Sequence, residues 1–257
     1  MMPRMRVSIE LVPRDLASLQ RQLDDTLALG SRVHAVNLPD LLRFELRSWD
    51  AALRARERAA AHGRSLDVIP HLRAMDVPVG APWAPSATLD AAGVHEVVVV
   101  QGDPPDDMRH ELSGASSLQI IAKLRRDHPH WRIYAALDPY RQSIAAEREY
   151  ALRKLDAGAD GFFTQPFFDV RLLAAWRDIL PDVPVYWGST SVTSERSLRY
   201  WISRNRAVFP SGFEPTLTWH QRFARDVLAY ARDTGAHVYF MPIRVSIADW
   251  LGDALAE

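Results

Sequence analysis

The chain has 257 residues, of which 47% are hydrophobic and 25% are charged, a composition typical of a globular protein with a large core. Its 31 basic and 32 acidic residues leave a net charge of -1, which does not indicate a surface for nucleic acid or anionic membranes. The absence of cysteine excludes disulfides, thiolate catalysis and cysteine-held iron–sulfur clusters, and it fits a cytoplasmic location.

No stretch approaches the roughly 18 uninterrupted apolar residues of a membrane span, and residues 1–6 lack the apolar segment of a signal peptide. We therefore expect neither a membrane nor a nucleic acid among the partners of this protein.

Short apolar runs alternate with amphipathic stretches along the chain. The clearest run is His95-Glu-Val-Val-Val-Val100, whose four consecutive valines are typical of a strand buried on both faces. Strands are predicted over residues 7–13, 33–39, 66–71, 95–100, 131–137, 162–166, 183–188 and 237–241. Helices are predicted over residues 16–29, 49–62, 86–92, 115–126, 143–156, 169–179, 194–205, 216–234 and 245–255.

Local signals mark the ends of several of these helices. Asp15, Ser48 and Asp169 each precede a helical pattern and are predicted to cap it. Gly30 and Gly63 follow two of the helices and are predicted to end them.

Eight strands that alternate with helices, at about 25–40 residues per unit, predict a (β/α)8 barrel. No linker, repeat or low-complexity segment interrupts the pattern, so residues 1–257 are predicted to form a single barrel domain. A doubly wound sheet is the rival fold, but Pro13-Arg-Asp15 stands where its Gly-x-Gly-x-x-Gly fingerprint would follow the first strand.

Polar side chains stand at the carboxyl ends of six predicted strands. Each alone has a simpler interpretation, such as a packed histidine for His71 or a turn for Asp103. Together they favour an active site, because the carboxyl ends of barrel strands meet at one rim. No metal site is predicted, since His71 and Asp76 lack ligand partners at a diagnostic spacing. The six side chains are Glu10, Asn37, His71, Asp103, Asp138 and Gln165.

One stretch, Lys154-Leu-Asp-Ala-Gly-Ala-Asp-Gly-Phe-Phe-Thr-Gln-Pro-Phe-Phe-Asp-Val170, resembles the central motif of methylenetetrahydrofolate reductases, which are flavin-containing (β/α)8 barrels. Three shorter matches occur in the same order as in that family. They are Val7-Ser-Ile-Glu10-Leu-Val-Pro13, which is similar to the family's first strand, His71-Leu-Arg-Ala-Met-Asp76, and Gln101-Gly-Asp103-Pro-Pro105.

The resemblance implies roles for particular residues. Glu10 is expected to be the general acid, and Asp103 is expected to lie near the flavin ring, so these two are the predicted catalytic residues. Gln165 is expected to contact the pterin, and Trp201 is expected to help hold the substrate. The predicted cofactor contacts are Asn37, His71, Gln101, Gly102, Asp103, Ala115, Tyr134, Arg153 and Lys154.

The reaction implied by the resemblance is reduction of 5,10-methylenetetrahydrofolate to 5-methyltetrahydrofolate by NADH or NADPH, by way of FAD. Three departures fall on expected flavin contacts. Gln101 replaces an arginine, Gly114 stands where the family has a tyrosine, and the alignment around Tyr134 is ambiguous by a few residues. Two alternatives therefore stay open: a reductase that uses the same folate pocket without flavin, and a folate-binding subunit that needs a partner for activity. A homo-oligomer is also open.

Overall fold

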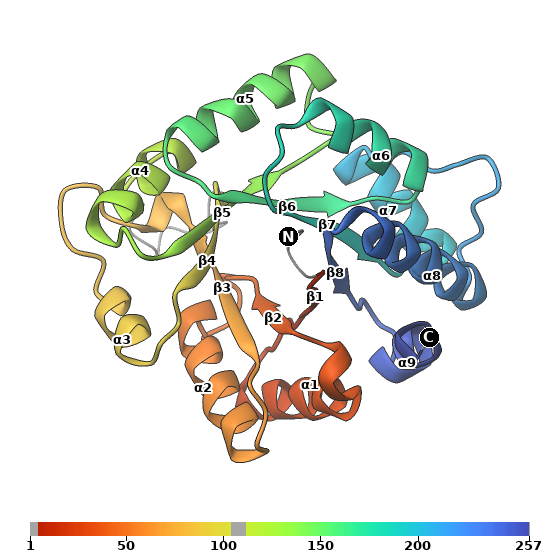
Figure 1. The fold of residues 1–257 in the computed structure, drawn as a ribbon, viewed down its shortest axis with the longest axis horizontal. Helices are drawn as coiled ribbons and strands as arrows, with labels where there is room; N and C mark the ends of the chain where they lie inside the picture. The colour runs from red at the N-terminus through yellow and green to blue at the C-terminus, as the bar shows by residue number, and fades with distance from the viewer. Residues whose placement is uncertain (1–4, 104–111, 257) are drawn as a thin grey trace.

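Eight parallel strands pair in sequence order and close into a barrel (Figure 1). The computed structural model describes residues 5–103 and 112–256. Pairing of Val7 with Val238 joins the first strand to the last, so the predicted single (β/α)8 barrel is confirmed. The strands are β1 (Val7–Glu10), β2 (Ala35–Leu38), β3 (Asp67–Arg73), β4 (Glu96–Val100), β5 (Arg132–Leu137), β6 (Gly161–Pro166), β7 (Val185–Thr190) and β8 (His237–Met241).

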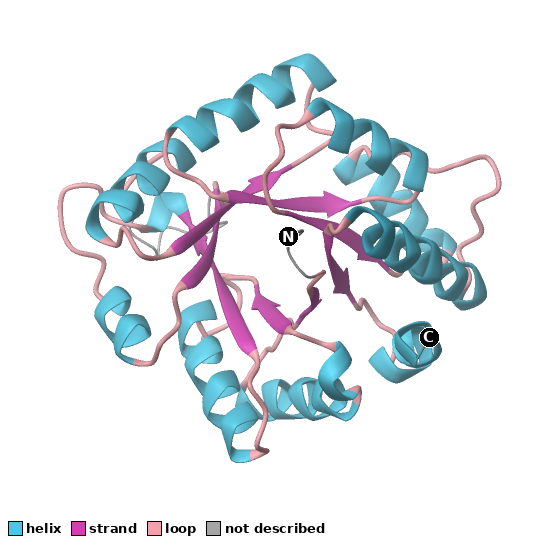
Figure 2. Ribbon diagram, in the orientation of Figure 1, coloured by secondary structure: helices cyan, strands magenta, loops and turns pink. Residues whose placement is uncertain are grey.

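The helices form an outer layer around the strands (Figure 2). Every helix expected from the sequence is present, and two 3₁₀ turns, η1 (Gly30–Arg32) and η2 (Ala74–Asp76), were not predicted. Among the described residues, no helix is both long and apolar enough to cross a membrane. The helices are α1 (Leu16–Ala28), α2 (Ser48–Ala61), α3 (Pro85–Ala91), α4 (Ser117–Asp127), α5 (Ile144–Asp156), α6 (Val170–Ile179), α7 (Glu195–Asn205), α8 (Leu217–Thr234) and α9 (Ile247–Ala256).

Large aromatic side chains fill the inside of the barrel. The rings of Phe163 and Tyr186 stack with their centroids 4.2 Å apart, and Tyr134 packs edge-on against both. Because these rings occupy the interior, the barrel is a packed core and not a pore. The buried inner cluster consists of Ala35, Ile69, Val98, Tyr134, Phe163, Tyr186 and Tyr239.

The predicted caps are confirmed in two cases and wrong in one. Asp15 accepts a hydrogen bond from Ser18 N–H at the start of α1, and Asp169 caps α6. Ser48 is instead the first residue of α2, and its N–H donates to the Asp40 carboxylate at 3.1 Å. Asp40 therefore caps this helix from the loop that precedes it.

The backbone conformation at Gly158, in the central motif, requires a glycine. Gly158 follows α5 with φ of 109°, and an added Cβ would lie 2.8 Å from Arg125 Cγ. Arg125 donates to the carbonyl of Gly158 at 3.0 Å and to the carboxylate of Asp160, which also accepts from Ile133 N–H. This part of the motif holds the turn into β6 and not a ligand.

Candidate active site at the carboxyl ends of the strands

A cavity of about 230 Å³ opens at the carboxyl ends of the strands. We call it the mouth. Its lining includes five predicted site residues, which come from β1, β3, β6, the loop after β4 and helix α5. They are Glu10, His71, Gln101, Lys154 and Gln165. The fold thus brings together side chains that are far apart in the sequence, as the barrel prediction requires.

Glu10 lies almost entirely out of water at the mouth, with 6% of its surface exposed. Burial raises the pKa of Glu10 to about 8, although a hydrogen bond from Asn37 opposes the shift. Asn37 donates to Oε2 at 2.9 Å, and within the described part of the chain Oε1 has no hydrogen-bond partner. The carboxyl group therefore keeps its proton at neutral pH and can donate it into the cavity.

His71 stands next to this pair and is neutral. Burial lowers the pKa of His71 to about 4. Its Nε2 lies 3.2 Å from Asn37 Nδ2, which can only donate, so the ring proton is on Nδ1. Ser8 donates to Asn37 Oδ1 at 2.8 Å. The amide of Asn37 is therefore fully used inside the protein, and it positions Glu10 and His71 without lining the mouth.

Helix α5 supplies the opposite wall. Lys154 is buried, its Nζ lies 2.5 Å from the carbonyl oxygen of Ala136, and it stands 4.1 Å from the centre of the Tyr150 ring. Burial lowers the pKa of Lys154 to about 8. Sequence reasoning missed Glu147 and Tyr150, which also line the mouth. Glu147, Tyr150 and Lys154 follow one another at spacings of three and four residues, which places all three on one helical face and could have identified them.

A buried carboxylate organises the rim between β5 and α5. Glu147 has no exposed surface and accepts hydrogen bonds from Arg141 at 2.6 Å and from Asp138 N–H at 3.3 Å. Burial raises the pKa of Asp138, which also lines the cavity. Arg141 and Glu147 compensate each other's charge, so the rim is polar without a large excess of either sign.

Gln101 lines the mouth but is occupied by its own loop. Its Nε2 donates to the carbonyl of Ala115 at 3.1 Å, and its Oε1 accepts from Ser117 N–H at 2.9 Å. Ala115 is buried and does not face the cavity. The side chain that replaces the expected arginine thus fastens the β4 loop to the start of α4.

The segment Gly102–Asp103 packs against Arg73. Gly102 has φ of 83°, and an added Cβ would lie 3.2 Å from Arg73 Cβ. Arg73 donates to the carbonyl oxygen of Asp103 at 2.6 Å, while the Asp103 side chain is exposed and outside the cavity lining. Among the described residues, Asp103 is therefore not part of the cavity lining that contains Glu10. The two prolines that follow, Pro104 and Pro105, lie outside the described residues.

Three further predicted contacts are also outside the lining of the mouth. Tyr134 is fully buried in the inner aromatic cluster, 5.3 Å from the ring of Tyr186. Trp201, which is on α7, is buried against Phe168. Arg153 is exposed on α5, and its guanidinium lies 5.1 Å from the centre of the ring of Tyr150, which lines the mouth. Tyr134 and Trp201 pack into the core, whereas the side chain of Arg153 projects from α5 into solvent.

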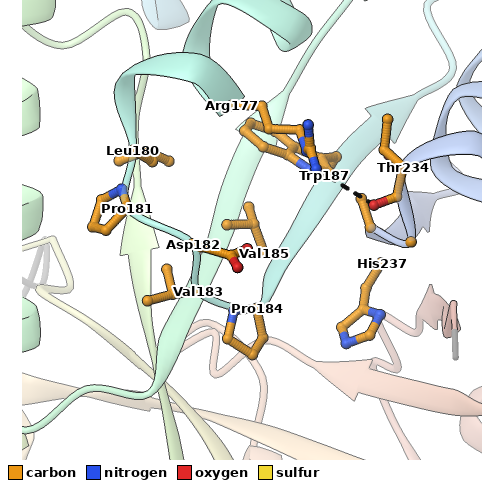
Figure 3. A pocket seen from close by; sticks show the side chains of 12 residues that line it. Arg177, Leu180, Pro181, Asp182, Val183, Pro184, Val185, Trp187, Thr234 and His237 are labelled. Carbon is orange, nitrogen blue, oxygen red and sulfur yellow. Dashed lines mark hydrogen bonds between the residues drawn. The ribbon is translucent and has the colours of Figure 1, made fainter. Parts of the chain in front are cut away.

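A second hollow lies at the other end of the barrel (Figure 3). It measures about 720 Å³ and is lined by residues that precede and begin β7 and β8, including Arg177, Asp182 and His237. No predicted site residue lines it. Because active sites of barrel enzymes sit at the carboxyl ends of the strands, the smaller mouth is the candidate active site.

The fold and the mouth define a class: (β/α)8 barrel enzymes with a protonated carboxyl group among the strand ends. The family model for methylenetetrahydrofolate reductase matches residues 48–211, and the chain belongs to this family. Glu10 and Asn37 precede the matched segment. No curated protein matches the chain.

Solved structures support the fold alone, because their sequence identity is low. Dihydropteroate synthase from Xanthomonas albilineans aligns with 100% of this chain and 92% of its own, at 17% identity and a TM-score of 0.53. The corresponding enzyme from Stenotrophomonas maltophilia aligns over the same shares at 15% identity and a TM-score of 0.54. A 2,3-dimethylmalate lyase aligns with 98% of this chain and 78% of its own, at 12% identity and a TM-score of 0.58.

Proposed function

We propose that this protein is an oxidoreductase that reduces 5,10-methylenetetrahydrofolate to 5-methyltetrahydrofolate, with NADH or NADPH as the reductant. Family membership supports a folate enzyme. The observation that carries the proposal is the carboxyl group of Glu10, which stays protonated at the mouth near neutral pH.

The reaction needs such a proton. The methylene group bridges N5 and N10 of the folate, and it must open to an iminium at N5 before it can accept hydride. N10 leaves as an amine, which is a poor leaving group unless it is protonated. Glu10 gives its proton to N10, and the hydride of the nicotinamide adds to the methylene carbon. Gln165, which carries both a donor and an acceptor, suits the edge of the pterin.

FAD, the hydride carrier that the resemblance predicts, is poorly supported by the described residues. Asn37 and Ala115 are buried and do not face the cavity, and the Gln101 amide is already hydrogen-bonded to Ala115 and Ser117. These observations favour the flavin-independent reductase as the second candidate function.

Two measurements on freshly purified protein test the proposal. The absorbance spectrum separates the flavoprotein, which is yellow, from the flavin-independent enzyme, which is colourless. Oxidation of NADH and of NADPH is then followed with 5,10-methylenetetrahydrofolate, and 5-methyltetrahydrofolate is identified by mass spectrometry.

Formation of the methyl product supports the proposal with either spectrum. Absence of turnover with both nicotinamides, together with calorimetric binding of reduced folate, would instead identify a folate-binding subunit that depends on a partner. Absence of both turnover and folate binding would overturn the assignment of the mouth as a folate site.

A further inference from the structure

A cluster of metal-binding side chains lies at the amino end of β4, at the opposite end of the barrel from the mouth. Asp90 is in the last turn of α3, and His95 directly precedes β4. His128 and His130 lie in the turn between α4 and β5. Ligand atoms of Asp90, His95 and His130 all lie within 4.8 Å of one another. We call these three residues with His128 the histidine cluster.

The distances suit a bound ion. A tetrahedral zinc site with bonds of about 2.0–2.2 Å holds its ligand atoms roughly 3.4 Å apart. His95 Nε2 lies 3.4 Å from Asp90 Oδ1, which is too long for a strong hydrogen bond but matches such an edge. His130 Nε2 is hydrogen-bonded to the same oxygen at 2.9 Å, and His128 Nδ1 is 3.7 Å from Asp90 Oδ2. The ligand atoms of Asp90, His95 and His130 thus lie close enough together to reach one ion, which would replace the hydrogen bond between His130 and Asp90.

A hydrogen bond from a buried tryptophan fixes the carboxylate of Asp90. Trp131, which is 1% exposed, donates its Nε1–H to Asp90 Oδ1 at 2.6 Å. The Trp131 ring also stacks on His128, with centroids 4.3 Å apart. Carboxylates that bind metals usually carry such a supporting hydrogen bond, which fixes their orientation.

The cluster is open to solvent, and no lysine or arginine of the described residues forms an ion pair with it. The side chains of His95 and His130 are 44% and 52% exposed, so an ion can reach them without unfolding. Among the described residues, the ion pairs of Asp90 involve only histidines and no lysine or arginine. Its negative charge is therefore available to a bound cation.

We propose that the histidine cluster binds one Zn²⁺ ion through Asp90, His95 and His130. Imidazole and carboxylate are ligands that zinc prefers, and a water molecule or His128 completes the coordination. The ion joins α3, the start of β4 and the turn before β5. Because the mouth is at the other end of the strands, the ion stabilises the barrel and takes no part in the reduction of folate.

Calorimetric titration of the metal-stripped protein, without a histidine tag, with ZnCl₂ tests the site. The wild-type protein is expected to bind one equivalent. The His95→Ala/His130→Ala double variant is expected to lose affinity by about a hundredfold or more, since removal of a residue that only supports a metal ligand already costs about 10–100-fold. His62→Ala, which removes the exposed histidine directly after α2, is the matched control and retains wild-type affinity.

A second variant and a second measurement guard against a folding defect. Asp90→Asn keeps the shape of the side chain and an acceptor for Trp131, and it should also weaken binding. Zinc should raise the melting temperature of the wild-type protein and of His62→Ala, because a ligand that binds only the folded state stabilises it. The melting temperatures of the two cluster variants should not change when zinc is added. Equal zinc affinity in the wild-type protein and the double variant would overturn the proposal.

Discussion

Glu10 joins two properties in one side chain: it lines the mouth, and it is almost completely removed from water. Its charged form is disfavoured by burial, so its pKa of about 8 keeps it protonated where an exposed glutamate would be ionised. The family resemblance predicted Glu10 as the general acid. Its support by Asn37 was not predicted, since it depends on the register of β1 and β2, in which Glu10 pairs with Asn37.

Replacement of Glu10 by glutamine tests its role. Glutamine cannot donate a proton to N10, and we expect kcat to fall by about 10²–10⁴-fold, the usual contribution of a general acid, while reduced folate still binds. The measurement is steady-state turnover together with calorimetric folate binding. Glu57→Gln, an isosteric change on the exposed face of α2, is the control and should retain full activity.

The pH dependence of turnover provides a separate prediction for the same residue. Because the acid form of Glu10 is the active form and its pKa is about 8, kcat of the wild-type enzyme should be constant near neutral pH and fall as pH rises through about 8. The residual activity of Glu10→Gln should lack this alkaline decline. An identical decline in the variant would mean that another group controls it.

At the scale of elements, the loops around the mouth are tied together by an ionic network that the sequence did not reveal. Asp40 accepts from Arg47 and from the N–H of Ser48, Arg47 reaches Asp76 at 3.4 Å, and Arg73 donates to Asp76 at 2.8 Å. The network connects the loop before α2 to the ends of β3 and β4. Its Asp40–Arg47 and Arg73–Asp76 pairs are local in the sequence, and its Arg47–Asp76 contact joins two segments that the fold brings together.

The Asp40→Ala variant tests this network. The Asp40 side chain is 1% exposed, so its loss leaves Arg47 without its main partner and α2 without its cap. We expect the free energy of unfolding to fall by about 2–4 kcal/mol, measured by urea denaturation. Glu57→Ala breaks an exposed pair with Arg54 and should cause no measurable change. Equal stability of wild type and Asp40→Ala would show that the network is dispensable.

The sequence predicted elements better than the directions of side chains. The valine run of β4 and the polar strand ends indicated a barrel and its rim, since both depend on local patterns. Tyr134 and Trp201 were expected at the site, but aromatic side chains pack equally well into a core, and periodicity does not separate the two. The histidine cluster was missed because His95 and His130 are separated by most of a β/α unit, and no spacing rule connects them.

For the whole molecule, buried titratable groups set the pH range of stability. Burial lowers the pKa of His71, His220 and His237 to about 4 each. In the unfolded chain these histidines titrate near 6.5, so the unfolded state takes up protons first as the pH falls. The stability that they contribute is fully present above about pH 6.5 and is lost as the pH falls toward 4. The raised pKa of Glu10 acts in the opposite sense, because its contribution is present at low pH and is lost as the pH rises through 8.

His220→Gln separates one of these contributions from the rest. Glutamine can replace His220 Nε2 as the acceptor for Val192 N–H, a hydrogen bond of 2.9 Å, but it does not bind a proton. We expect the decline in unfolding free energy between pH 6 and pH 4.5 to become shallower by up to about 1.4 kcal/mol per pH unit, which is the effect of one proton. Urea denaturation at several pH values measures this slope. The exposed His62→Gln change is the control, and its stability curve should run parallel to the curve of the wild-type protein. If the curve of His220→Gln is also parallel to that of the wild-type protein, burial of His220 does not govern acid sensitivity.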